Sequence, residues 1–335
     1  MIIAEIGSVH DGSFGNAKKM IDVAKKCGAD MVKFQMHIAE HETLKDALKP
    51  SYFSDETRFD YFKRISFSND QWKALINYSK KKKIKFMCSV FSNQAFDKLY
   101  NFGVKDIKIP SGELNNLPLI NYLSKKKDIN IFLSTGMSSW KEIDTAVKLL
   151  KKNSLIIMQC TSLYPCPDKF VGLNVITQMQ KRYGKDVLYG FSDHTFGSEA
   201  AICSIVYGAK FIEKHITFSK EMYGSDAKFA MEPNEFKLFC KSIKKSKKII
   251  LSKVDKDNLK PIMKMKKVFE KNIVAKKSIK KGTIIKFTDL EFKKSKKGIK
   301  AFNYKSIIGL TAKKNIFKGS LINYKDFLKT FIPNI

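Results

Sequence analysis

Eight short apolar segments, each followed by a stretch with helical periodicity, constrain the fold of this chain more than any other feature. The segments are 1–6, 31–36, 84–90, 106–109, 130–134, 155–160, 188–191 and 210–212. Alternation of strand and helix favours parallel strands covered by helices, because a parallel pair needs a long crossover connection. Eight such units in roughly 250 residues are typical of a closed (β/α)8 (TIM) barrel.

An open, doubly wound sheet is the alternative arrangement of the same units. Its dinucleotide-binding form carries a glycine-rich turn after the first strand. Residues 7–12, Gly-Ser-Val-His-Asp-Gly, lack that spacing, so we expect the barrel. An insertion between the second and third units, which includes a helix predicted over 52–64, lengthens one side of it.

The C-terminal part of the chain contains an internal repeat. The pattern that starts at Ala275 and leads to Asp289 returns 37 residues later, from Ala312 to Asp326. Each copy predicts a strand, a Lys-Gly turn and a second strand, which is typical of a compact β-rich module. We therefore expect a catalytic barrel over 1–251, a charged linker over 252–274 and a β-rich domain over 275–335.

The formal net charge of +31 suggests a nucleic-acid or membrane partner. However, only Arg58, Arg64 and Arg182 are arginines among 63 lysines and arginines. Arginine is the residue that reads bases and phosphates with two hydrogen bonds, and the lysines are spread over many expected helix faces. We therefore expect neither nucleic acid nor membrane as a partner, although the positive field would attract an anionic substrate.

The six cysteines lack metal-finger spacing, and most fall inside apolar segments, where cysteine acts as a small hydrophobic residue. No signal peptide precedes Ile2, and no apolar run approaches the length of a membrane span. These features predict a reduced, cytoplasmic protein.

Polar residues gather at the C-terminal ends of the expected strands, the face at which barrel enzymes build their sites. They include Glu5, Lys33, Lys108, Ser111, Glu113, Ser134, Ser162, Tyr164, His194 and His215. Lysines are costly to bury there unless an anion meets them, so the two lysines indicate a phosphate or carboxylate ligand. The alternative is that each ammonium reaches water along its own stem. The three serines supply hydroxyl donors, and the two glutamates are candidate proton carriers.

His194 and His215 follow two neighbouring strands of one strand–helix–strand unit, so both are expected at the same end of the barrel, within reach of one ion. Two neutral imidazoles suit a divalent metal such as manganese, zinc or iron(II). The alternative is two separate histidines, each satisfied by its own hydrogen bonds. The residues alone predict a metal-dependent enzyme that acts on a small anionic substrate and a carbonyl partner, without choosing the reaction.

Taken together, these stretches resemble the sialic acid synthase family, whose members condense phosphoenolpyruvate with an N-acylated amino sugar. The matching segments are 3–7 (Ile-Ala-Glu-Ile-Gly) with His10 and Gly12, 28–35 (Gly-Ala-Asp-Met-Val-Lys-Phe-Gln), 108–113 (Lys-Ile-Pro-Ser-Gly-Glu), 134–137 (Ser-Thr-Gly-Met), 160–165 (Cys-Thr-Ser-Leu-Tyr-Pro), 192–195 (Ser-Asp-His-Thr) and 213–215 (Glu-Lys-His). The C-terminal repeat resembles the antifreeze-like (SAF) domain of that family.

The resemblance implies a role for each candidate residue. Lys33, Lys108, Ser111, Ser134 and Ser162 would bind phosphoenolpyruvate; His194 and His215 would bind a divalent metal; Glu5 and Glu113 would be catalytic with them; and Tyr164, Asp226 and Lys294 would meet the acceptor sugar. Manganese is the expected metal, with magnesium or cobalt as alternatives. The resemblance also implies a domain-swapped homodimer in which the SAF domain helps to close the partner's site.

The expected reaction yields a nine-carbon 2-keto sugar acid and phosphate, with N-acetylmannosamine as the first acceptor to consider. Legionaminic or pseudaminic acid synthesis from a diacetamido-trideoxyhexose is the alternative within the family. An aldulosonate-phosphate synthase on a similar barrel is disfavoured, because such enzymes lack an SAF-like module. An inactive, basic polyanion-binding protein is the alternative from another class.

Two positions depart from the family pattern. Val9 stands where the family commonly has asparagine, and residues 293–298, Lys-Lys-Ser-Lys-Lys-Gly, replace a turn that commonly carries arginine. A lysine cannot copy the planar fork of an arginine. Both positions are expected where the family senses the acceptor sugar.

Overall fold

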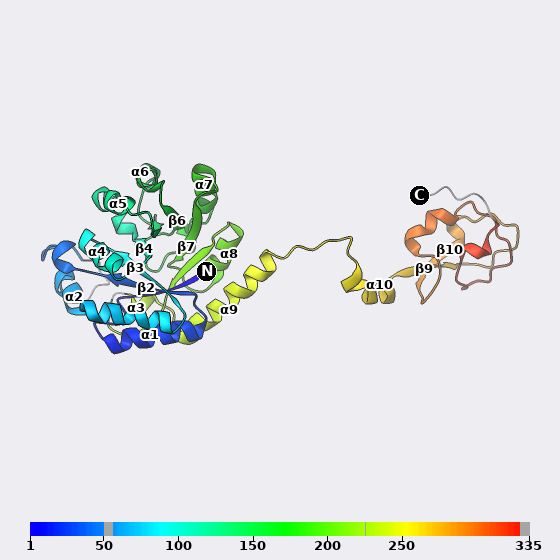
Figure 1. The fold of residues 1–335 in the computed structure, drawn as a ribbon. Coiled ribbons are helices and arrows are strands. Elements are labelled where there is room, and N and C mark those ends of the chain that lie inside the picture. The colour runs from blue at the N-terminus through cyan, green and yellow to red at the C-terminus, as the bar shows by residue number, and fades with distance from the viewer. Residues whose placement is uncertain (50–55, 225, 329–335) are drawn as a thin grey trace. The chain divides into compact units, whose positions relative to one another are not determined.

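Eight parallel strands close into a barrel in the order β1 to β8, with β8 hydrogen-bonded to β1 (Figure 1). The strands are β1 Ile2–Gly7, β2 Met31–Met36, β3 Lys85–Val90, β4 Asp106–Ile109, β5 Asn130–Ser134, β6 Ser154–Gln159, β7 Leu188–Asp193 and β8 Phe211–His215. This computed structural model describes residues 1–49, 56–224 and 226–328. The predicted barrel is confirmed, and the closure between β8 and β1 excludes the open sheet.

Helices cover the outside of the barrel. They are α1 Phe14–Cys27, α2 Arg58–Ile65, α3 Asn69–Lys81, α4 Asn93–Asn101, α5 Leu117–Ser124, α6 Trp140–Leu150, α7 Asn174–Tyr183, α8 Glu199–Val206 and α9 Pro233–Ile250. The side chains of Ser68 and Ser139 cap the first turns of α3 and α6 in complete capping boxes. The helix predicted over 52–64 begins at Arg58, and 52–55 lie outside the described residues. Among the described residues, no helix has the length and hydropathy needed to cross a membrane.

An apolar layer fills the interior of the barrel below a polar one. The buried residues of the apolar layer include Ile3, Met31, Met87, Phe132, Ile156 and Met158, with Phe211 packed against them. Side chains two positions apart on a strand share a face, so the next inward residues on five of these strands are Glu5, Lys33, Ser89, Ser134 and Glu213. The packed floor therefore places a layer of polar side chains at the C-terminal ends of the strands.

The chain divides into two compact units, Met1–Ser252 and Lys253–Ile335. The second contains α10 Met263–Phe269 and an antiparallel pair, β9 Lys271–Ala275 and β10 Leu290–Lys294, so the folded unit takes in the last residues of the predicted linker. Backbone bridges such as Ile279–Ile316 join the two copies of the repeat.

The repeated aspartates of the second unit have matching environments. Asp289 and Asp326 are both buried, and each forms an ion pair of 2.8 Å, with Lys277 and Lys314 respectively. The 37-residue offset seen in the sequence therefore corresponds to two structurally equivalent halves of one small β-rich domain.

Candidate active site

A pocket of about 150 Å³ opens at the C-terminal ends of the barrel strands. Ten of the twelve predicted site residues line it: Glu5, Lys33, Lys108, Ser111, Ser134, Ser162, Tyr164, His194, His215 and Asp226. Side chains from distant parts of the sequence therefore converge, at the face where barrel enzymes carry their chemistry.

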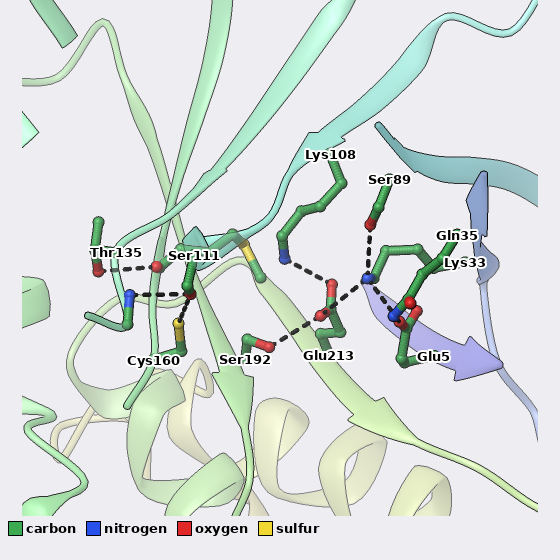
Figure 2. A network of polar contacts seen from close by, with 12 residues as sticks. Glu5, Lys33, Gln35, Ser89, Lys108, Ser111, Thr135, Cys160, Ser192 and Glu213 are labelled. Carbon is green, nitrogen blue, oxygen red and sulfur yellow. Dashed lines mark hydrogen bonds and ion pairs between the residues drawn. The ribbon is translucent and has the colours of Figure 1, made fainter. Parts of the chain in front are cut away.

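Glu213 joins the two lysines of the pocket (Figure 2). Its carboxylate lies 2.8 Å from Nζ of Lys108 and 3.5 Å from Nζ of Lys33, and it accepts a hydrogen bond of 2.9 Å from Ser192. Nζ of Lys33 also lies 2.9 Å from Oε1 of Glu5. Because the two lysine residues are only 4% and 2% exposed, their ammonium groups do not reach water along their stems. They are positive groups held in place by carboxylates at the bottom of the pocket.

The two carboxyl groups of this network are driven toward different protonation states. Burial raises the pKa of Glu5, and the nearby Lys33 offsets this rise only in part. Burial also opposes ionisation of Glu213, but the charges of Lys108 and Lys33 outweigh it and lower its pKa. Glu213 is thus a permanent counter-charge, whereas Glu5 is suited to exchange a proton.

The two carboxylate oxygens of Glu5 have different surroundings. Its Oε1 is occupied by Lys33 and by the amide of Gln35, at 2.9 and 2.7 Å. Its Oε2 is buried and has no hydrogen-bond partner within the described part of the chain. An unpaired buried carboxyl oxygen is costly, which favours a ligand hydroxyl or a proton at this position.

Hydroxyl groups surround Gly136 on the opposite wall. A Cβ atom there would lie 2.4 Å from Oγ of Ser162 and 2.7 Å from both Oγ of Ser111 and Sγ of Cys160. Oγ of Ser111 accepts a hydrogen bond of 3.1 Å from the Gly136 N–H group, while Oγ of Ser162 is buried without a partner among the residues described. Together with the buried Ser134, these groups form a set of donors suited to anion oxygens.

The two predicted metal ligands lie side by side, with ring centroids 5.8 Å apart. Nδ1 of His194 lies 2.8 Å from the Thr161 carbonyl oxygen, which only accepts, so Nδ1 carries the hydrogen and Nε2 keeps its lone pair. Burial, followed by the effect of His215, lowers the pKa of His194 to about 3. His194 is therefore neutral, the form that binds a metal.

Nδ1 of His215 is buried and has no hydrogen-bond partner in the described ranges. No group of three or more potential metal-binding side chains occurs there either. The pair thus fits a divalent ion that takes its remaining ligands from water and substrate oxygens. The ring of Tyr164 covers His194 at a centroid distance of 4.3 Å.

Asp226 and Gln35 border the pocket beside Gly7, the last residue of β1. A Cβ atom on Gly7 would lie 2.5 Å from Oδ2 of Asp226, 3.2 Å from Nε2 of Gln35 and 3.3 Å from Oε1 of Glu5. The backbone of Gly7 has φ +52°, which glycine adopts without strain. Glycine here lets three polar groups meet at the side of the pocket away from the serines.

Glu113 is not among the residues that line this pocket, and Lys294 belongs to the other compact unit. Glu113 ends a short 3-10 turn, Ser111–Glu113, and accepts a hydrogen bond of 2.7 Å from Asn116. Lys294 belongs to the second unit, where its ammonium lies 4.8 Å from the centroid of the Phe269 ring. Val9 is buried in the main core, so it does not line the pocket as its place in the sequence suggested.

Four lining residues with hydroxyl, amide or carboxylate side chains were not predicted as site residues: Gln35, Ser89, Ser192 and Glu213. Three of them lie two positions from a residue that was found, namely Lys33, His194 and His215. Residues two apart on a strand share a face. These three residues would therefore have been found if the residue two positions before or after each predicted site residue had been added as a candidate.

The barrel and the polar pocket at the C-terminal ends of its strands define the class of the protein, a (β/α)8-barrel enzyme. The chain belongs to the NeuB family, which residues 20–255 match, while residues 271–328 match the SAF domain.

Relatives agree over nearly the whole length. N,N'-diacetyllegionaminic acid synthase of Campylobacter jejuni is 36% identical over 337 residues, which cover 96% of this chain and 98% of that protein. Human N-acetylneuraminate-9-phosphate synthase is 35% identical over 85% of this chain and 80% of its own. The crystal structure of a sialic acid synthetase from Leptospira borgpetersenii is similar, with a TM-score of 0.68 at 26% identity over 80% of this chain and 91% of that one. The predicted family and fold are confirmed.

Proposed function

We propose that this chain condenses phosphoenolpyruvate with an N-acylated amino sugar, giving a nine-carbon 2-keto sugar acid and phosphate. The observation that carries this proposal is the pocket itself, in which two buried ammonium groups and a set of hydroxyl donors adjoin two imidazoles. Such donors suit the phosphate and carboxylate of phosphoenolpyruvate. The synthase names of the relatives support the same reaction class.

The residues of the chain divide between the two substrates. Lys33 and Lys108 would hold the anionic substrate above Glu213, with the serines around Gly136 as further donors. C3 of phosphoenolpyruvate would then bond to the aldehyde carbon of the acceptor, water would add at C2, and the C2–O bond to phosphate would break. Glu5, through its unpaired Oε2, is placed to exchange a proton with the acceptor oxygen.

His194 and His215 would hold a divalent ion, with manganese preferred and magnesium or cobalt as alternatives. When bound, such an ion polarises a carbonyl oxygen.

The proposal leaves the identity of the acceptor sugar open, and an assay with a panel of sugars determines it. Phosphate release should require phosphoenolpyruvate, a divalent metal and one of three sugars: N-acetylmannosamine, its 6-phosphate or a 2,4-diacetamido-trideoxyhexose. The mass of the product identifies the sugar. The similarity to the Campylobacter enzyme favours testing the diacetamido sugar beside N-acetylmannosamine. An enzyme that releases no phosphate with any of the three would contradict the proposed function.

We also propose a domain-swapped homodimer in which Lys294 of the second unit contacts the acceptor sugar. A Lys294→Met variant should then raise the KM of the acceptor and leave that of phosphoenolpyruvate unchanged. Lys280→Met changes an exposed lysine of the same unit and provides the matched control. Equal acceptor KM values in the wild type and in both variants would argue against a contact at Lys294.

A further inference from the structure

His37 is a buried histidine that none of the roles above uses. It follows β2 directly, and it is only 7% exposed. Its ring lies between the rings of Phe62 and Phe91, with centroid distances of 3.7 and 4.0 Å. Since a buried polar ring needs hydrogen-bond partners, the groups that face its two nitrogens show what holds it.

A chain of hydrogen bonds runs from His37 into the pocket. Nδ1 of His37 lies 2.7 Å from Oε1 of Glu42, and Nε2 lies 3.1 Å from Oε1 of Gln35. Nε2 of Gln35 then donates to Oε1 of Glu5 at 2.7 Å, and Figure 2 shows both side chains in the network around Lys33. The pair of Glu42 and His37 thus reaches Glu5 through a single amide group.

The direction of this chain follows from its donors and acceptors. Oε1 of Glu5 already receives the Lys33 ammonium, so it acts as an acceptor and the NH₂ group of Gln35 faces it. The amide oxygen of Gln35 is then left to His37 and can only accept. Nδ1 of His37 faces a carboxylate oxygen of Glu42, which also accepts. Both ring nitrogens of His37 therefore carry hydrogens in this arrangement, and Glu42 provides the counter-charge.

The same histidine also lies near the second predicted catalytic carboxyl. Burial raises the pKa of Glu113; among the neighbouring charges, Glu42 raises it further, whereas His37 and Arg58 lower it. Burial lowers the pKa of His10, and the nearby His37 lowers it further. The remaining charged groups on this side line a cavity of about 210 Å³ that His37 borders, and they are Glu40, Lys63 and Lys98.

We propose that His37 is a positioning residue for the acceptor side of the pocket. As a double donor held by Glu42, it fixes the amide of Gln35 with its NH₂ group toward Glu5, where Gln35 and Asp226 meet beside Gly7. This inference rests on the proposed function, because the acceptor sugar is the substrate assigned to that space. Without the N–H group on Nε2, the amide loses the donor that sets its orientation.

The first test separates the two substrates kinetically. His37→Phe keeps a flat ring between Phe62 and Phe91 but removes both donors. It should raise the KM of the acceptor by about tenfold, as expected for one lost hydrogen bond to a charged group, while the KM of phosphoenolpyruvate stays within about twofold. His41→Phe changes a nearby, exposed histidine and serves as the matched control. An unchanged acceptor KM in His37→Phe, or an equal rise in both KM values, would overturn the proposal.

The second test uses Glu42→Gln, a conservative change that removes the carboxylate but should keep the orientation of Gln35. In Glu42→Gln, the new amide can donate to Nδ1, so that a neutral ring still carries hydrogen on Nε2 and still orients Gln35. The acceptor KM of Glu42→Gln should therefore stay within about twofold of the wild-type value, unlike that of His37→Phe. A rise in acceptor KM in Glu42→Gln as large as that in His37→Phe would contradict this account.

A third measurement does not depend on turnover. In wild-type protein labelled with ¹⁵N-histidine, the His37 ring should show two N–H couplings, with the signals assigned by their loss in His37→Phe. A ring with only one N–H group would reject the inference even if the enzyme is active. If the acceptor panel gives no turnover but both couplings are seen, the proposed function fails and the hydrogen-bond chain stands.

Discussion

Replacing His215 by alanine should reduce turnover by a factor on the order of 10³ while leaving the fold intact. A bound metal stabilises developing negative charge by several kcal/mol, and about 1.4 kcal/mol corresponds to each factor of ten in rate. Nδ1 of His215 has no hydrogen-bond partner among the residues that the structure describes, so the substitution breaks no bond that supports the barrel. The same variant should lose its affinity for Mn²⁺. Turnover, binding of Mn²⁺ followed by electron paramagnetic resonance, and thermal unfolding measure these three expectations.

His41→Ala is the matched control for this prediction, because His41 is exposed and does not line the pocket. That variant should keep the wild-type rate and the wild-type affinity for Mn²⁺. If His215→Ala remains active, or if it loses activity only because it unfolds, the assignment of this side chain to a metal is wrong.

The second large effect is expected at the buried pair of Lys108 and Glu213. Lys108→Met removes the ammonium that lies 2.8 Å from Glu213 and leaves that carboxylate with Lys33 at 3.5 Å and the Ser192 hydroxyl. Breaking one partner of a buried ion pair costs about 3–5 kcal/mol. We therefore expect a loss of this size in the free energy of unfolding, together with a loss of phosphoenolpyruvate binding.

A double variant separates the stability effect from the binding effect. Lys108→Met with Glu213→Gln removes both charges and should recover most of the lost stability, since a buried pair replaced by neutral groups is often nearly neutral in energy. It should not recover binding of phosphoenolpyruvate, because the positive charge is still missing. Urea unfolding and calorimetric titration provide the two readouts. Recovery of binding in the double variant would show that Lys108 does not meet the substrate.

The barrel could be predicted because its signal is local and repeated. β2, β4 and β5 have the bounds that the apolar segments indicated, and the other strands differ by a few residues at their ends. Nine of the ten polar residues predicted at the strand ends line one pocket, because strand register and closure leave inward side chains little freedom. Asp226, which lines the pocket with them, was expected only from the resemblance. Their individual roles remain predictions.

Three features around the pocket, at Glu113, Glu213 and His37, could not be predicted from the local sequence pattern. Glu113 lies beyond the end of β4, in a 3-10 turn whose geometry decides where its side chain points. Glu213, two residues before His215, was given no role, because the function of this carboxylate follows only from the positions of Lys33 and Lys108 beside it. His37 sits among aromatic residues from two other segments, which only the folded chain brings together.

The central claim is that a divalent ion and an enol phosphate occupy adjacent parts of one pocket. Phosphorus relaxation of phosphoenolpyruvate tests it directly, because the paramagnetic effect of Mn²⁺ falls steeply with distance. In the wild-type protein, Mn²⁺ should strongly shorten the ³¹P relaxation times of bound phosphoenolpyruvate, and a His194→Ala/His215→Ala variant that still binds phosphoenolpyruvate should show no such effect. Relaxation that is unaffected by Mn²⁺ in the wild type, or equally shortened in the variant, would contradict the account.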